Sequence, residues 1–135
     1  MDATLLLCDA AQAVNGKFYI LGGGWSMILA PGVPTPVTLA VKLSVPWDQA
    51  NRPHKVRAAL MDADGQVVDL GDGPIEAEGN VEVGRPPGLK PGTPLDVLFA
   101  LPFGALAFES GTYAWQLEVD GDPVTREPFI VLPGN

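Results

Sequence analysis

The chain has 135 residues, 47% of them hydrophobic, and its formal net charge at pH 7 is −8. This length suits one domain, residues 1–135, and the hydrophobic content is ample for a core, which argues against disorder. The eight Lys and Arg residues are scattered, so the basic stripe that nucleic acid or an anionic membrane surface requires is missing. We therefore expect no nucleic acid and no membrane among the partners. The acidity is ascribed to solubility, with a basic partner surface as the alternative.

The chain has one cysteine, Cys8, so no internal disulfide can form, which is compatible with a reducing compartment. Cys8 follows Leu5, Leu6 and Leu7, and this setting predicts a buried, inert thiol. Residues 1–4 carry no basic group, so the apolar stretch behind them is not typical of a signal peptide. We expect a soluble, cytoplasmic protein.

Apolar and polar residues alternate in several short runs, which is the pattern of half-buried strands. Residues 3–13 form the first expected strand, and Asn15-Gly16 predicts a tight hairpin turn into the second. The glycines at 22–24 interrupt this second strand, as at a bulge. Residues 27–29 are expected to continue it.

The rest of the chain repeats this pattern, with glycine and proline between the runs. Further strands are expected at residues 37–45, 54–63, 67–70, 75–83, 95–101, 112–119 and 129–132. Asp64-Gly65 and residues 120–122 are hairpin signals, and the proline-rich residues 85–94 form the longest loop. Eight or nine strands, with no helix of more than a turn, indicate an all-β fold: a single antiparallel β-sandwich of immunoglobulin-like character.

Tyr113 follows Gly111 by two residues at the start of a late strand, which resembles the tyrosine corner of immunoglobulin-like sandwiches. In such a corner the hydroxyl bonds to backbone just upstream while the ring packs inward. We prefer this interpretation to a catalytic tyrosine. The residues expected in the core are Leu39, Val41, Leu43, Val56, Leu60, Val81, Val97, Phe99, Tyr113, Trp115 and Leu117.

Groups suited to catalysis are few, because the chain has one His and one Cys. Nothing marks the serine and acid of a catalytic triad around His54, which we interpret as a surface or capping histidine. One His and one Cys also fall short of a zinc site. Residues 22–25, Gly-Gly-Gly-Trp, lack the lysine and helix of a phosphate loop and indicate a kinked strand. We expect no catalytic residue, no metal and no cofactor.

Two acidic groups have competing interpretations. The aspartates of residues 62–72 are close enough to suggest calcium, but their spacing misses the EF-hand pattern and hairpin turns also favour Asp. Calcium is therefore the lesser alternative. Glu76, Glu78 and Glu82 alternate along one strand, which predicts a solvated face rather than the paired carboxylates of a glycoside hydrolase.

The loop after residues 37–45 is the most promising candidate for binding. Its candidate interaction residues are Trp47, Asp48, Asn51, Arg52 and His54. They combine an aromatic ring with several hydrogen-bonding groups, and Trp and Arg are enriched at binding hot spots. The alternative, which we favour, is that Trp47 folds over the end of the sandwich and seals the core.

Several motifs carry a resemblance to a known family. They are LLCDAAQ at residues 6–12, NGK at 15–17, YILGGGW at 19–25, VPWD at 45–48, NR at 51–52, His54, GRPPGL at 84–89 and LEVDG at 117–121. On these motifs the chain resembles a family of small uncharacterised bacterial proteins, a domain of unknown function, over nearly its whole length. The resemblance implies no activity, cofactor or catalytic residue.

We therefore expect a non-enzymatic interaction or structural module, because catalytic groups are few while strand edges and stiff proline loops suit assembly. It would self-associate as a homo-oligomer or dock on a protein partner within a larger assembly, such as a phage particle. The alternative is a small ligand-binding module, for sugar or peptide, that uses the Trp47 loop. An enzyme is the third and least favoured class.

Overall fold

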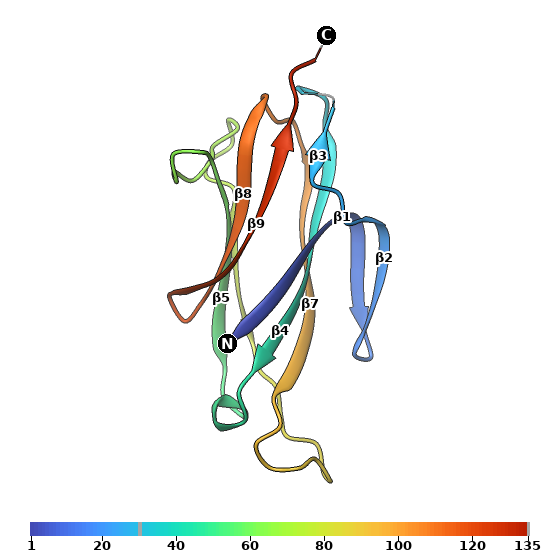
Figure 1. Cartoon of the computed structure of the whole chain (residues 1–135), viewed down its shortest axis with the longest axis vertical. Helices are drawn as coiled ribbons and strands as arrows, with labels where there is room; N and C mark the ends of the chain where they lie inside the picture. The colour runs from blue at the N-terminus through green and yellow to red at the C-terminus, as the bar shows by residue number, and fades with distance from the viewer. Residues whose placement is uncertain (30, 135) are drawn as a thin grey trace.

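The computed structural model describes residues 1–29 and 31–134, and β-strands dominate this part of the chain (Figure 1). The strands are β1 (Asp2–Val14), β2 (Lys17–Gly23), β3 (Met27–Ile28), β4 (Thr35–Val45), β5 (His54–Met61), β6 (Glu76–Val81), β7 (Leu95–Leu106), β8 (Gly111–Val119) and β9 (Asp122–Val131). One 3-10 turn, η1 (Trp47–Gln49), follows β4. The expected all-β class is confirmed.

The strands form two sheets. The first has four strands in the order β2-β1-β4-β7, and the second has five in the order β3-β9-β8-β5-β6. Neighbouring strands are antiparallel, except that β3 runs parallel to β9. In Figure 1, β5, β8 and β9 of the second sheet lie beside β4 and β7 of the first.

Apolar residues of the two sheets pack together in two buried clusters, of which the larger lies around Trp115. Leu39 and Val41 of β4 have no exposed surface, and they belong to the same buried cluster as Trp115 and Leu117 of β8. These residues are spaced by two along each strand, because alternate side chains of a strand point to the same face. The ring of Phe103 from β7 packs on Trp115 with 4.4 Å between centroids.

Most of the expected core residues are buried. Those confirmed are Leu39, Val41, Leu43, Val56, Leu60, Tyr113, Trp115 and Leu117. Val81, Val97 and Phe99 are only half-buried, although they pack against the core. They lie on β6 and β7, which are edge strands. An edge strand has a neighbouring strand on one side only, so its side chains are less completely covered.

Two of the expected hairpin turns have the backbone that their sequences require. Asn15 and Gly16 adopt φ angles of 52° and 72° between the paired ends of β1 and β2. Asp120 and Gly121 adopt 53° and 86° between β8 and β9. Two consecutive positive φ angles match the right-handed twist of the flanking strands, so Asn-Gly and Asp-Gly determine both registers.

The expectation that residues 27–29 continue the second strand is wrong. Met27 pairs with Ile130 of β9, so β3 belongs to the other sheet. The chain leaves β2 through Gly22 and Gly24, whose φ angles of 58° and 91° break the extended backbone. The glycines therefore mark a crossing between sheets.

The expected strand at residues 67–70 is reduced to isolated bridges. Met61 pairs with Val67, and Asp69 pairs with Pro74. Instead of continuing a ladder, the Asp69 carboxylate accepts backbone N–H bonds from Gly71 and Gly73, at 2.7 and 3.2 Å. Such local side-chain bonds compete with strand pairing.

The hydrogen bond expected of Tyr113 is present. Its hydroxyl donates to the Glu109 carbonyl oxygen at 2.8 Å. The ring stacks on Phe129, with 5.4 Å between centroids and 18° between planes. Tyr113 therefore joins the segment before β8 to the core.

Candidate interaction sites

The Trp47 loop is held in place by backbone bonds. The Gln49 N–H donates to the Pro46 carbonyl at 2.9 Å, which closes η1. Asn51 adopts a φ of 61°, a conformation that Asn tolerates better than most residues, and its N–H donates to the Val83 carbonyl at 2.8 Å. The loop is thus joined to the segment after β6.

Arg85 is the neighbour of Trp47 that the sequence did not reveal. Its guanidinium carbon lies 4.5 Å from the Trp47 ring centroid. Its Nε donates to the Trp47 carbonyl oxygen at 3.1 Å, and a terminal guanidinium nitrogen donates to the same oxygen. A cation over an aromatic face is attractive, and Trp offers the best such face. Nothing local in the sequence signals this pair, because only the fold brings the two loops together.

His54 lies inside the protein with 2% of its surface exposed, so the expectation of a surface histidine is wrong. Its Nδ1 lies 2.7 Å from the Asp120 Oδ2, and its Nε2 lies 2.7 Å from the Gln49 carbonyl oxygen. The second contact does cap the backbone of η1, as the alternative interpretation proposed. The ring therefore ties β5 to the loop before it and to the β8–β9 turn.

This geometry favours the charged form of His54. Burial alone disfavours an imidazolium, but the hydrogen bonds with the Asp120 carboxylate and the Gln49 carbonyl outweigh it and raise the pKa of His54. The same bond from His54 lowers the pKa of Asp120, which also accepts from the Lys55 N–H at 3.0 Å. In the imidazolium form both ring nitrogens donate, one to each of these two acceptors.

The five candidate residues do not share one surface. Trp47 and Asp48 help to line an open hollow of about 460 Å³. The lining comprises Met1, Asp2, Ser44, Pro46, Trp47, Asp48, Gly92 and Pro94. Asn51 and Arg52 are exposed outside this lining, and His54 is buried. Gly92 and Pro94 come from the proline-rich loop at residues 85–94, which only the fold brings beside the Trp47 loop.

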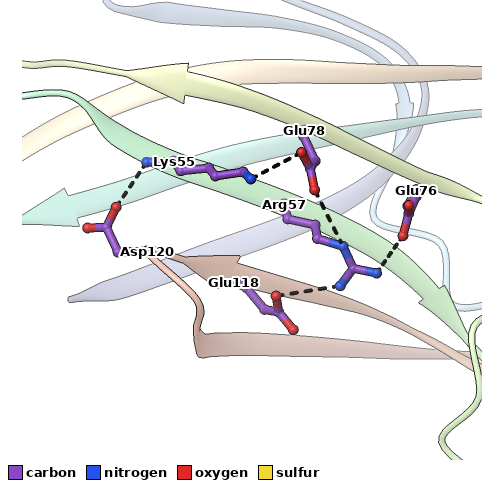
Figure 2. A network of polar contacts seen from close by, with 6 residues as sticks. All are labelled: Lys55, Arg57, Glu76, Glu78, Glu118 and Asp120. Atoms are coloured by element: carbon purple, nitrogen blue, oxygen red, sulfur yellow. Dashed lines mark hydrogen bonds and ion pairs between the residues drawn. The ribbon is translucent and has the colours of Figure 1, made fainter.

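The outer face of the second sheet carries a network of ion pairs (Figure 2). Arg57 on β5 pairs with Glu76 on β6 and with Glu118 on β8, whose Oε2 lies 3.5 Å away. Lys55 pairs with Glu78 at 3.3 Å. The hydrogen bond to Glu76 is the main cause of the raised pKa of Arg57. Glu76 and Glu78 are exposed and paired with cations, so the predicted solvated face is confirmed for them. Glu82 is also exposed, but it lies just beyond the end of β6.

Asp62 belongs to a turn. Its Oδ1 accepts the backbone N–H groups of Asp64 and Gln66, each at 2.9 Å. Such bonds are the ordinary reason for Asp at turns. Across residues 1–29 and 31–134, no group of three or more His, Cys, Asp and Glu is arranged to hold a metal ion.

The predicted burial of Cys8 is confirmed, since none of its surface is exposed. Its thiol donates to the Thr38 carbonyl oxygen at 3.2 Å. Burial raises the pKa of the thiol, which keeps it protonated and poorly nucleophilic.

The second half of β1 and all of β2 form a two-stranded ribbon beside the body of the protein, with β2 at the outer margin (Figure 1). One hollow beside the ribbon is lined by Ala10, Ala11, Gln12, Tyr19, Ile20, Leu21, Thr38 and Pro102, so the ribbon lies along β4 and β7. Tyr19 and Leu21 are 60% and 72% exposed. The sequence predicts a strand here but not an exposed apolar surface. The signal for such a surface is that apolar residues occupy both faces of β2.

The structure therefore defines an all-β protein of two sheets with an exposed apolar ribbon. Within the described residues, no helix is long and apolar enough to span a membrane. A family model described as "Family of unknown function (DUF6941)" matches residues 3–132, and the chain belongs to this family. No curated protein matches the chain.

Proposed function

We propose that the protein is a non-enzymatic interaction module that self-associates, or docks on a larger assembly, through the β1–β2 ribbon. The observation that carries this proposal is the exposure of Tyr19 and Leu21 on β2, an edge strand of the first sheet. An edge strand presents unpaired backbone groups to any second strand. Large apolar side chains gathered on one exposed element are typical of interaction surfaces.

The setting of His54 favours this function over catalysis. A general base must reach a proton of its substrate through a free nitrogen. Both ring nitrogens of His54 instead lie 2.7 Å from structural partners, Asp120 and Gln49. With 2% of its surface exposed, this histidine serves the packing of the loop.

The proposal includes docking of the protein on a larger assembly, of which a phage particle is one example. The proline-rich loop at residues 85–94 supports it, because Arg85 joins that loop to Trp47. A loop stiffened by proline loses little entropy when a partner binds it. We also propose a reducing, cytoplasmic location in a bacterium, since the single cysteine, Cys8, is a buried free thiol.

We further propose that the two sheets make one domain, an immunoglobulin-like β-sandwich. The shared core supports a sandwich, and the Tyr113 hydroxyl bonded to Glu109 upstream has the form of a tyrosine corner.

Light scattering coupled to size-exclusion chromatography tests the proposal on the full chain at micromolar concentration. We expect a mass above that of a monomer, which decreases on dilution. A monomer at every concentration, with no partner recovered in pull-down experiments, would contradict the proposal.

A ligand-binding module is the second candidate, favoured by the hollow beside Trp47. The Trp47 ring, Pro46 and Pro94 supply apolar walls, and Asp2 and Asp48 supply acceptors, a combination suited to a sugar or a peptide. Titration with oligosaccharide and peptide panels tests this candidate. Binding that Trp47→Ala abolishes, with the fold intact, would establish it, whereas no binding by the unaltered protein would exclude it.

A further inference from the structure

We propose that β2 pairs, in antiparallel orientation, with β2 of a second copy of this chain about a two-fold axis beside Tyr19. This inference rests on the proposed self-association and names its partner and its contact. The first sheets of the two copies then join edge to edge. Isologous pairing of this kind closes a dimer, because each copy offers the same strand to the other.

The free edge of β2 presents the backbone of Phe18 and Ile20. Val14 and Lys17 flank the two-residue turn of the β1–β2 hairpin, so they form a hydrogen-bonded pair. The direction of hydrogen bonding alternates along an antiparallel strand. Every second residue from Lys17 therefore faces β1, and the N–H and C=O groups of Phe18 and Ile20 face outward.

The register follows from these free groups. A pairing centred on Tyr19 places Phe18 of each copy opposite Ile20 of the other, so every outward group of both residues finds a partner. A centre at Ile20 would instead place Phe18 opposite Gly22. The φ of Gly22 is 58°, which departs from the extended backbone that a ladder requires. The regular part of β2 thus selects Tyr19 as the centre.

The side chains agree with this register. Tyr19 lies opposite Tyr19 of the second copy in a non-hydrogen-bonded pair, where side chains approach most closely. Aromatic pairs at such positions are favourable. Leu21 lies opposite Lys17 of the second copy, whose aliphatic stem can cover it. The pairing therefore covers Tyr19 and Leu21, which are 60% and 72% exposed in one copy.

The other sheet edges of the described chain fit a second copy less well. β6 carries Glu76 and Glu78, β7 contains Pro102, and β3 has only two residues. Charges, proline and short length are the usual protection of edges. β2 has no proline, and Lys17 is its only charged residue. In a chain with a net charge of −8, an edge without carboxylates is where a second copy meets least repulsion.

Disulfide trapping tests the register. The variant Tyr19→Cys brings two thiols opposite each other at a Cα separation of roughly 4.5 Å, within the range of a disulfide. We expect a covalent dimer under mild oxidation at micromolar concentration. In the control Leu21→Cys, the two thiols are offset by about four residues, roughly 13 Å, and we expect no dimer. Equal trapping of both variants, or trapping of Leu21→Cys alone, would overturn the inference.

Charge complementation tests the contact without a covalent bond. Tyr19→Glu or Tyr19→Lys alone places like charges opposite each other, and we expect the dimer to weaken about tenfold or more. An equimolar mixture of the two variants should restore the dimer. Circular dichroism spectra like that of the unaltered protein, with a cooperative thermal transition, confirm that both variants fold; the transition itself should move down as the dimer is lost. Dimers that persist in each variant alone, or a mixture no stronger than its components, would refute the pairing.

The two proposals fail in different ways. If the unaltered chain is oligomeric but trapping and complementation give the contrary results, self-association stands and another surface makes the contact. If the unaltered chain is a monomer at every concentration, self-association and the β2 pairing fall together.

Discussion

His54 and Asp120 are joined by a contact of 2.7 Å between Nδ1 and Oδ2, although 66 residues separate them along the chain. The contact links the first residue of β5 to the turn between β8 and β9. Asp120 reinforces the link, because its Oδ1 accepts from the Lys55 N–H at 3.0 Å and its own N–H donates to the Lys55 carbonyl at 2.8 Å. Since the other nitrogen of His54 faces Gln49, one buried ring joins three segments at this end of the second sheet.

The first prediction concerns the pH dependence of this link. The raised pKa of His54 means that its contribution is complete below its ordinary pKa and is lost as pH rises through the raised value. The lowered pKa of Asp120 means that its contribution is complete above its ordinary pKa and is lost as pH falls through the lowered value. The pair therefore stabilises the fold most between roughly pH 4 and pH 6.5.

The variant Asp120→Asn measures this contribution. We expect it to lower the free energy of unfolding by about 1–2 kcal/mol near pH 5.5, allowing for screening of a half-exposed carboxylate. The loss should be smaller at pH 9, and urea unfolding at both pH values measures the difference. In a His54→Gln background, Asp120→Asn should have the same effect at both pH values. A loss that is independent of pH with His54 present would contradict the assignment.

The second prediction concerns the Tyr113 hydroxyl. Tyr113→Phe removes the bond to the Glu109 carbonyl but keeps the ring on Phe129. We expect a loss of about 1 kcal/mol in the free energy of unfolding, measured with urea. Tyr113→Leu also removes the aromatic contacts and should lose distinctly more. No measurable loss in Tyr113→Phe would show that the corner bond is neutral.

The sequence predicts those parts of the fold that depend on neighbours along the chain. Leu39 and Val41 have core positions because a strand alternates its faces. Asn15-Gly16 and Asp120-Gly121 determine their turns through positive φ angles. The Tyr113 bond also follows from a local motif, since Glu109 is four residues upstream.

The parts that could not be predicted depend on distant segments. Whether residues 27–28 extend β2 or join β9 is decided by Ile130, about a hundred residues later. Val97 belongs to an alternating run like that of Leu43, but it is less buried because β7 is an edge strand. Alternation of apolar residues predicts a strand and does not predict its position in the sheet. The candidate residues around Trp47 do not form one site, again because of contacts with distant segments. His54 is buried and bonded to Asp120, whereas Trp47 lines a hollow on the surface.

The third prediction concerns Trp47 and Arg85. The ring is half-buried, with the guanidinium carbon 4.5 Å from its centroid. Trp47→Ala should therefore lower the free energy of unfolding by less than the roughly 3–5 kcal/mol of a fully buried aromatic. In a double-mutant cycle with Arg85→Ala, we expect a coupling energy of about 0.5–1 kcal/mol.

Arg85→Lys is the matched control, because a lysine keeps the charge but not the planar fork that reaches the Trp47 carbonyl. It should keep part of the coupling, since an ammonium is also attracted by the ring. Additive losses from Trp47→Ala and Arg85→Ala would mean that the contact between the two loops does not stabilise the fold. Arg85 would then not fix the position of the Trp47 ring, which lines the hollow.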